Sequence, residues 1–147
     1  MNYSGYNGFA IHFASSKINL YNSINNKKLS LNPEDYYSGK SILKNLNSLG
    51  KVNKKNSKKN KYNINQKKYL DKISMSLGSL IGLLINITDP NCLILGGGVI
   101  ENNLYFSKKI KKNIRKYIFA DKCKRMPIIN SKLKGDAGLL GAAAIFK

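Results

Sequence analysis

The sequence predicts an α/β fold, and two features of its second half support this. Apolar runs at residues 92–95 and 126–129 have the length of short strands, and a helical pattern separates them at residues 103–118. A further helical segment follows at residues 137–146. Because strand–helix–strand–helix order is typical of α/β sheets, we expect a sheet with a right-handed crossover. With 147 residues, 42% of them hydrophobic, the chain can bury a core as one domain or one lobe of a larger one.

The first part of the chain predicts shorter elements. Residues 9–13 and 18–21 have the composition of short strands, and we expect them to pair. Residues 22–32 are polar and typical of a loop. A helix is expected from near Ser38 to near Leu46.

Residues 51–60 are almost all Lys, Asn and Ser and cannot bury apolar surface. We therefore predict an exposed Lys/Asn-rich loop over about residues 51–66 within a single lobe of residues 1–147. The strongest helix follows, and Asp89-Pro90 ends it because proline disfavours a helical residue before it. Its apolar residues recur at helical spacing: Leu70, Ile73, Leu77, Leu80, Ile81, Leu84 and Ile87.

No membrane span is expected, because the longest apolar stretch, residues 77–87, is short and is interrupted by Ser79, Gly82 and Asn86. Cys92 and Cys123 are far apart and form no CxxC pair. Their spacing argues against a disulfide scaffold or a zinc site, and the N-terminus shows no basic-then-apolar signal segment. We therefore expect a cytoplasmic protein.

The formal net charge is +19, from 26 Lys and Arg against 7 Asp and Glu. Lys- and Asn-rich composition over the whole chain explains this better than nucleic-acid binding, since arginine, which contacts bases and phosphates in a bidentate manner, is rare. A basic nucleic-acid-binding protein that uses residues 51–68 remains an alternative. In that case Tyr62 and Tyr69 would stack on bases.

Gly96, Gly97 and Gly98 directly follow the apolar run Leu93-Ile94-Leu95. In open α/β sheets, ligands bind beyond the carboxyl ends of the strands, and glycines let backbone N–H groups approach them. On spacing alone, a plain turn explains the triplet equally well, and no GxGxxG fingerprint follows a strand. Asp136 precedes the last helix and is expected to be its N-cap; the small residues Gly138, Gly141, Ala142 and Ala143 would allow that helix to pack closely.

In this order, residues 87–98 and 135–143 resemble the C-terminal half of the ROK sugar kinases, a family of ATP-dependent hexokinases and related repressors. The resemblance implies the C-terminal lobe of an actin-like (ribonuclease H-like) ATPase fold. It also implies that Gly96, Gly97 and Gly98 lie against the nucleotide, which in the family is ATP with Mg²⁺.

The resemblance extends to two motifs near the N-terminus. Residues 5–12 are similar to the family's G-x-x-G-E-x-G-H sugar motif, in which His12 keeps its place while Phe9 replaces the glutamate and Ile11 the last glycine. Residues 34–39 look like E-x-Y-x-S-G, in which Glu34 would contact the sugar. On the residues alone, a lone histidine beside apolar neighbours, as His12 is, is more often a satisfied core residue than a ligand.

Upstream of Glu34 the family carries a C-x-C-G-x-x-G-C zinc motif. The cysteine positions fall here on Asn25, Lys27 and Asn32. A lysine ammonium is no substitute for a thiolate, and asparagine is a poor one, so we expect the structural zinc to be lost.

Family members are about twice this length, and the lobe that carries their phosphate-binding Asp-Gly turn and catalytic aspartate has no counterpart in these residues. We therefore interpret the chain as a shortened, degenerate ROK kinase for a hexose or N-acetylhexosamine, inactive alone, with residues 34–40 favouring the N-acetylglucosamine kinase branch. Its expected partner is a separate N-terminal lobe or a second copy. The alternative is a non-catalytic sugar-binding or regulatory module.

Overall fold

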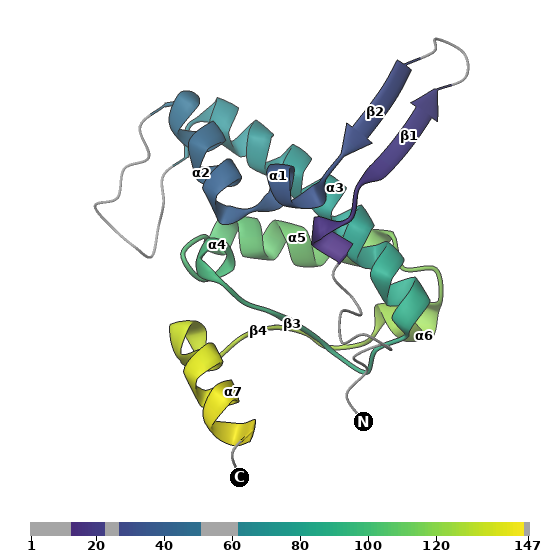
Figure 1. The fold of residues 1–147 in the computed structure, drawn as a ribbon, viewed down its shortest axis with the longest axis vertical. Coiled ribbons are helices and arrows are strands. Elements are labelled where there is room, and N and C mark those ends of the chain that lie inside the picture. The colour runs from purple at the N-terminus through teal and green to yellow at the C-terminus, as the bar shows by residue number, and fades with distance from the viewer. Residues whose placement is uncertain (1–12, 23–26, 51–61, 146–147) are drawn as a thin grey trace. The chain divides into compact units, whose positions relative to one another are not determined.

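The computed structural model describes residues 13–22, 27–50 and 62–145 (Figure 1). They belong to two compact units, Met1–Asn45 and Leu46–Lys147. The architecture is α/β and mostly helical, which confirms the predicted class. The assignment of all 147 residues to one lobe stays a prediction.

The first unit holds a short 3-10 turn, η1 (Phe13–Ser15), and a hairpin of β1 (Ile18–Asn22) and β2 (Lys27–Leu31). The strands are antiparallel, with Ile18 opposite Leu31 and Leu20 opposite Leu29. The prediction of a loop throughout residues 22–32 is therefore wrong. Alternating KKLSL forms a strand because its backbone pairs with β1. The strand expected at residues 9–13 lies outside the described residues except for Phe13, which begins η1.

Two helices follow the hairpin. In α1 (Pro33–Tyr37), proline occupies the first turn, and the Asn32 side chain caps the helix by accepting a hydrogen bond from the Glu34 N–H at 3.1 Å. The predicted helix near residues 38–46 is confirmed as α2 (Gly39–Ser48). The Ser38 hydroxyl accepts a hydrogen bond from the Ser41 N–H at 3.3 Å at the start of α2.

The second unit is built around α3 (Ile64–Thr88), which begins with a capping box. Asn63 Oδ1 accepts a hydrogen bond from the Gln66 N–H at 2.8 Å, and Gln66 Oε1 accepts one from the Asn63 N–H at 3.0 Å. The helix therefore begins within the loop predicted at residues 51–66, whose residues 51–61 lie outside the described part. At its end Asp89 adopts the left-handed conformation, φ 41°, so the predicted stop is confirmed.

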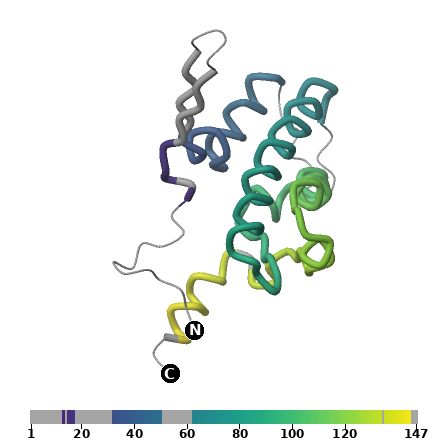
Figure 2. The backbone as a smooth tube through the Cα atoms, turned by 90° about the vertical axis from the view of Figure 1, so that its right-hand side faces the viewer, coloured from purple at the N-terminus to yellow at the C-terminus, as the bar shows by residue number. Residues whose placement is uncertain are grey.

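By length and composition alone, α3 could cross a membrane. This differs from the expectation that the interruptions in residues 77–87 exclude a membrane span. Core helices of soluble proteins pass the same test, and α3 packs along α5 (Leu104–Lys116), so this does not indicate a membrane protein (Figures 1 and 2). The buried stripe of α3 shares only Leu70 with the predicted apolar series, and Ile87 is 69% exposed. The buried positions are Gln66, Leu70, Ser74, Gly78, Gly82 and Ile85.

Beyond α3, a two-stranded parallel sheet joins β3 (Leu93–Leu95) and β4 (Ile128–Asn130). The helices α4 (Gly98–Glu101), α5 and α6 (Asp121–Lys124) lie between the strands in sequence. The predicted strands and intervening helix are confirmed, but residues 92–95 are not fully buried as expected: Leu95 is 8% exposed and Ile94 is 60% exposed. The chain continues through η2 (Lys134–Asp136) into α7 (Ala137–Ile145).

Candidate functional site

The glycine turn, Gly96–Gly98, lies at the carboxyl end of β3, where the parallel partner β4 also ends. The Ser131 N–H donates to the Leu95 carbonyl at 2.7 Å and so extends the pairing to this edge. This is the edge at which α/β sheets bind ligands.

Gly97 has a backbone conformation that favours glycine, φ 93°, and it caps the start of α4. A Cβ atom added to Gly97 would meet no atom within 4 Å, and one added to Gly96 would lie 3.4 Å from Ser131 Cβ. All three glycines are exposed. The turn thus presents bare backbone to solvent, a surface against which a flat or anionic ligand can lie.

Glu101 already occupies part of this turn. Its Oε1 accepts a hydrogen bond from the Gly97 N–H at 3.2 Å. A carboxylate at this N–H occupies a position that a phosphate oxygen would take, and it repels such an anion. Sequence reasoning missed this contact, although an acidic residue in the first turn of a helix is a recognisable signal.

Glu34 belongs to the first unit and lies in the first turn of α1. Its carboxylate is exposed, and Oε2 accepts from the Ser15 hydroxyl at 3.5 Å, the long limit for such a bond. The glycine turn belongs to the second unit. His12, the other predicted sugar ligand, lies outside the described residues.

The structure describes two of the three positions that the resemblance aligns with the family's zinc cysteines. Asn25 lies outside the described residues, Lys27 is the first residue of β2, and the Asn32 side chain caps α1. Within the described ranges, no group of three or more His, Cys, Asp and Glu residues could hold a metal ion. The loss of zinc stays a prediction.

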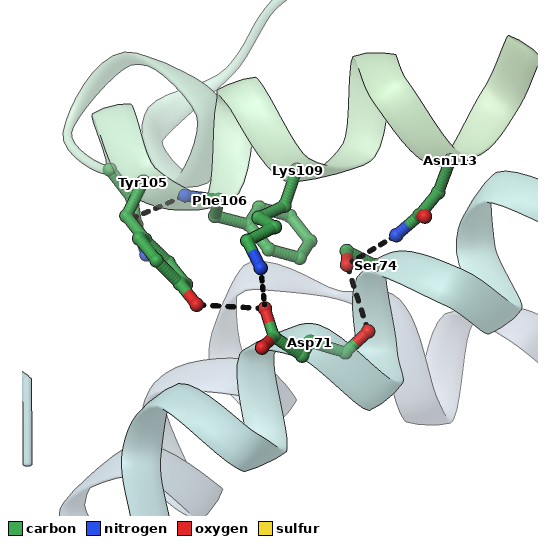
Figure 3. A network of polar contacts seen from close by, with 7 residues as sticks. Asp71, Ser74, Tyr105, Phe106, Lys109 and Asn113 are labelled. Atoms are coloured by element: carbon green, nitrogen blue, oxygen red, sulfur yellow. Dashed lines mark hydrogen bonds and ion pairs between the residues drawn. The ribbon is translucent and has the colours of Figure 1, made fainter. Parts of the chain in front are cut away.

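Sequence reasoning also missed a polar cluster between α3 and α5 (Figure 3). Asp71 Oδ1 accepts from the Tyr105 hydroxyl at 2.8 Å and lies 3.1 Å from Lys109 Nζ. The pKa of Tyr105 is raised, first by partial burial and second by its hydrogen bond to Asp71. The pKa of Lys109 is also raised, mainly by its contact with Asp71. Because Asp71 and Tyr105 are 34 residues apart, no local pattern could have predicted the contact.

Deeper in the same interface, Asn113 Nδ2 donates to Ser74 Oγ at 2.9 Å, and Ser74 Oγ donates to the Asp71 carbonyl at 2.8 Å (Figure 3). Both side chains are buried. This network and the Asp71 cluster join α3 to α5, so we assign them a structural role. Asp136 directly precedes α7, the position predicted for its N-cap.

Comparison with known proteins places these features in a family. The sequence model of the ROK family matches residues 33–147, which include Glu34 and the glycine turn. An uncharacterised protein of Clostridium perfringens is 30% identical over 81 residues, which make up 55% of this chain and 28% of that protein.

Two solved structures are similar. One comes from Cytophaga hutchinsonii and is described as a putative sugar kinase. The match covers 95% of this chain and 48% of that structure's chain, with a TM-score of 0.55 and 19% identity. The two proteins therefore share the fold. A ROK family glucokinase from Streptomyces griseus, solved with glucose and AMPPNP, matches 54% of this chain and 26% of its own, with a TM-score of 0.48 and 25% identity. The chain therefore spans less than half the length of each of these relatives. Because the ROK model matches well over half of its residues, the chain belongs to the ROK family.

Proposed function

We propose that these residues form the nucleotide- and sugar-contacting half of an ATP-dependent ROK sugar kinase, the C-terminal lobe of its actin-like fold. The glycine turn would hold the nucleotide, and Glu34 and His12 the sugar. The substrate would be a hexose or an N-acetylhexosamine, and residues 34–40 favour N-acetylglucosamine. The observation that carries the proposal is the open glycine turn at the carboxyl edge of a parallel sheet, inside the segment that the ROK model matches.

The glycine turn fits a nucleotide on its shape, because the side of Gly97 that a Cβ would occupy is open. Bound ATP with Mg²⁺ would supply the phosphoryl group. Glu101 opposes this fit, since its carboxylate occupies the Gly97 N–H. We therefore expect nucleotide binding to require displacement of Glu101, which weakens it.

The acidic residues of the chain support inactivity of this half alone. Among the described residues, five of the chain's seven acidic side chains have partners: Glu34 with Ser15, Asp71 with Tyr105 and Lys109, Asp89 with Cys123, Glu101 with Gly97, and Asp121 with Lys124. By the family resemblance the catalytic aspartate belongs to the other lobe, so we expect none of the seven to replace it. Phosphoryl transfer needs an oriented nucleophile as well as a held phosphate, so the other half of the fold must supply the base.

Nucleotide binding is tested by titration of the full chain with a fluorescent ATP analogue in the presence of Mg²⁺. Gly97→Val places a side chain in the open space and should weaken binding about tenfold or more, a loss of roughly 1.4 kcal/mol. Gly135→Ala is the matched control, because a Cβ there also meets no atom within 4 Å but lies outside the turn. Equal affinities of wild type and both variants would contradict a nucleotide site at this turn.

Activity is tested by a coupled assay with glucose, N-acetylglucosamine and N-acetylmannosamine. The chain alone should show no sugar-dependent ATP turnover near about 1 s⁻¹, a typical enzyme rate. Sugar-dependent turnover that disappears in Glu34→Gln would show instead that this half is catalytically complete.

A further inference from the structure

The outward face of α5 carries a concentration of positive charge. Six of the 13 residues of α5 are Lys or Arg and none is acidic, whereas the whole chain has 26 Lys and Arg in 147 residues. The Lys-rich composition of the chain therefore does not account for this helix. The buried residues of α5 are Phe106, Ser107, Ile110, Asn113 and Ile114. Because these positions pack against the rest of the unit, the basic side chains are left on the outward side.

Two of the six basic side chains already have partners within the molecule. Lys109 turns toward α3, where its Nζ lies 3.1 Å from Asp71 Oδ1 (Figure 3). The Arg115 guanidinium donates to the carbonyl oxygens of Lys124 and Met126. The other four side chains form no ion pair or hydrogen bond with any described residue. They are Lys108, Lys111, Lys112 and Lys116.

Helix geometry places these four residues, the lysine row, on one face of α5. Lys108, Lys112 and Lys116 follow one another about 6 Å apart along the helix, and Lys111 lies beside them. Like charges at this spacing repel each other and destabilise a helix. The helix dipole favours Lys116 in the last turn, but it does not favour the charges of the earlier turns. The lysine row therefore does not serve the stability of α5, and its ammonium groups are available to an anionic partner.

We propose that the lysine row is a docking surface for an acidic helical segment of another protein. Carboxylates at every fourth position of such a helix repeat at the same interval of about 6 Å, so the two rows of charge are complementary along their length. Leu104 lies one turn before Lys108 on the same face and is 57% exposed, and it offers the partner an apolar contact at the end of the row. The proposal is independent of kinase activity.

Two observations favour a polypeptide over the phosphates of a nucleic acid. Bidentate recognition of a phosphate needs a guanidinium group, and the only one on α5, that of Arg115, is bonded to backbone carbonyls. A sugar–phosphate backbone also supplies no apolar side chain to cover Leu104. Lysine ammonium groups, in contrast, act as point charges and pair readily with carboxylates.

The test uses the full chain and a synthetic acidic peptide, about 18 residues long so that it forms a helix alone. This peptide carries three glutamates one turn apart and a leucine one further turn along the same face. The control peptide has the same composition, with its glutamates on three different faces. Binding is measured by fluorescence anisotropy at low ionic strength, where exposed charges are least screened. The acidic peptide should bind more tightly than the control peptide, and its affinity should fall as salt rises.

Paired substitutions locate the contact. The variant Lys108→Gln/Lys112→Gln should bind the acidic peptide about three- to tenfold more weakly, because each exposed ion pair contributes little. The variant Lys68→Gln/Lys72→Gln is the matched control, since these lysines are also exposed and one turn apart, on α3, and it should bind as wild type does. Glutamine has nearly the helix propensity of lysine, so both variants should fold.

Acetylation of lysines, followed by mass spectrometry, gives a second measurement. Bound acidic peptide should protect Lys108 and Lys112, whereas Lys68 and Lys72 should react as in the free chain. Equal protection of the two pairs, equal affinity for the two peptides, or an affinity that neither double variant changes would overturn the proposal in favour of general charge attraction. Tighter binding of duplex DNA, or of vesicles of phosphatidylcholine and phosphatidylserine, that the α5 variant weakens would overturn it in favour of a phosphate partner.

Discussion

Gly82 lies where α3 and α5 approach closely. A Cβ atom added to it would lie 2.6 Å from Tyr117 Cβ, and one added to Gly78 would lie 3.0 Å from Asn113 Cβ. The two helices thus meet through backbone contacts that side chains would prevent. This explains why the buried stripe of α3 contains Gly78 and Gly82 as well as the large apolar residues Leu70 and Ile85.

Gly82→Ala should lower the free energy of unfolding by about 1–3 kcal/mol, because the added methyl group forces the helices apart. Urea denaturation measures this loss. Gly141→Ala in α7 is the control, since its Cβ would meet no atom within 4 Å, and it should be neutral or stabilise by about 0.5–1 kcal/mol through helix propensity. Equal losses in the two variants would contradict a close α3–α5 contact at Gly82.

Cys123 should ionise at a higher pH than an ordinary thiol. It donates to Asp89 Oδ1 at 3.1 Å, and this bond, followed by burial, raises the pKa of the thiol above its ordinary value. A raised pKa means that the folded state holds the proton more tightly. The resulting stability is therefore present below the pKa of the unfolded thiol and is lost as pH rises through the folded value.

The pH dependence of alkylation by iodoacetamide, measured in a Cys92→Ser background, should have its midpoint above that of an ordinary cysteine thiol. Asp89→Asn should lower the midpoint, because it removes the carboxylate while asparagine still tolerates the left-handed backbone at this position. An unchanged midpoint in Asp89→Asn would show that the thiol does not depend on Asp89.

Among the helices and strands, the sequence predicted those elements whose structure depends on residues close together in the chain. The apolar period and Asp89-Pro90 located α3 and its end, and the run before Gly96 located β3. The strand β2 was missed because its polar composition resembles a loop and only pairing with β1 makes it a strand. The burial of individual residues was also missed, since it depends on neighbours such as α5 that are distant in sequence.

In the candidate site, too, features set by neighbouring residues were predictable and contacts between distant residues were not. The position of the glycine turn followed from the sequence, whereas its open space and its contact with Glu101 needed the fold. Glu34 was recognised from a motif, but its bond to Ser15 spans 19 residues. The Asp71 cluster joins two helices and leaves no sequence signature.

The start of α3 depends on one buried amide. Gln66 is 1% exposed, and its Nε2 donates to the carbonyl oxygens of Leu46 at 3.0 Å and Gly50 at 2.8 Å. Gln66→Glu keeps an oxygen for the capping box but removes both donors and places a carboxylate against two carbonyl groups. It should destabilise the fold by about 1–3 kcal/mol at neutral pH.

The matched control for this change is Asn65→Asp, which makes the same change of charge one residue earlier on an exposed side chain. It should be neutral or slightly stabilising, because a negative charge near a helix N-terminus is favourable. Thermal melts of the two variants should therefore diverge. Similar melting temperatures would refute a specific role for the Gln66 amide.

For the whole molecule, two opposing properties decide its behaviour in solution. Exposed apolar side chains such as Ile94, Leu139 and Leu140 favour association, and the net charge of +19 opposes it through repulsion between copies. Salt weakens only the second, since the Debye length falls to about 8 Å at physiological ionic strength. The balance between the two is therefore set by ionic strength.

Self-association of the isolated chain should consequently rise with salt, as a broad distribution of species in dynamic light scattering. Ile94→Lys should reduce it at high salt, because Ile94 and its register partner Ile129 are both exposed, and Ile64→Lys should reduce it less, although both add one charge. A nucleic-acid-binding protein would show the opposite dependence toward its ligand, since displaced counterions make that affinity fall steeply as salt rises. The salt series is therefore measured with and without duplex DNA. A monomer at every salt concentration, together with strong DNA binding that salt abolishes, would mean that the positive charge serves nucleic-acid recognition and that the exposed isoleucines of the sheet do not drive association.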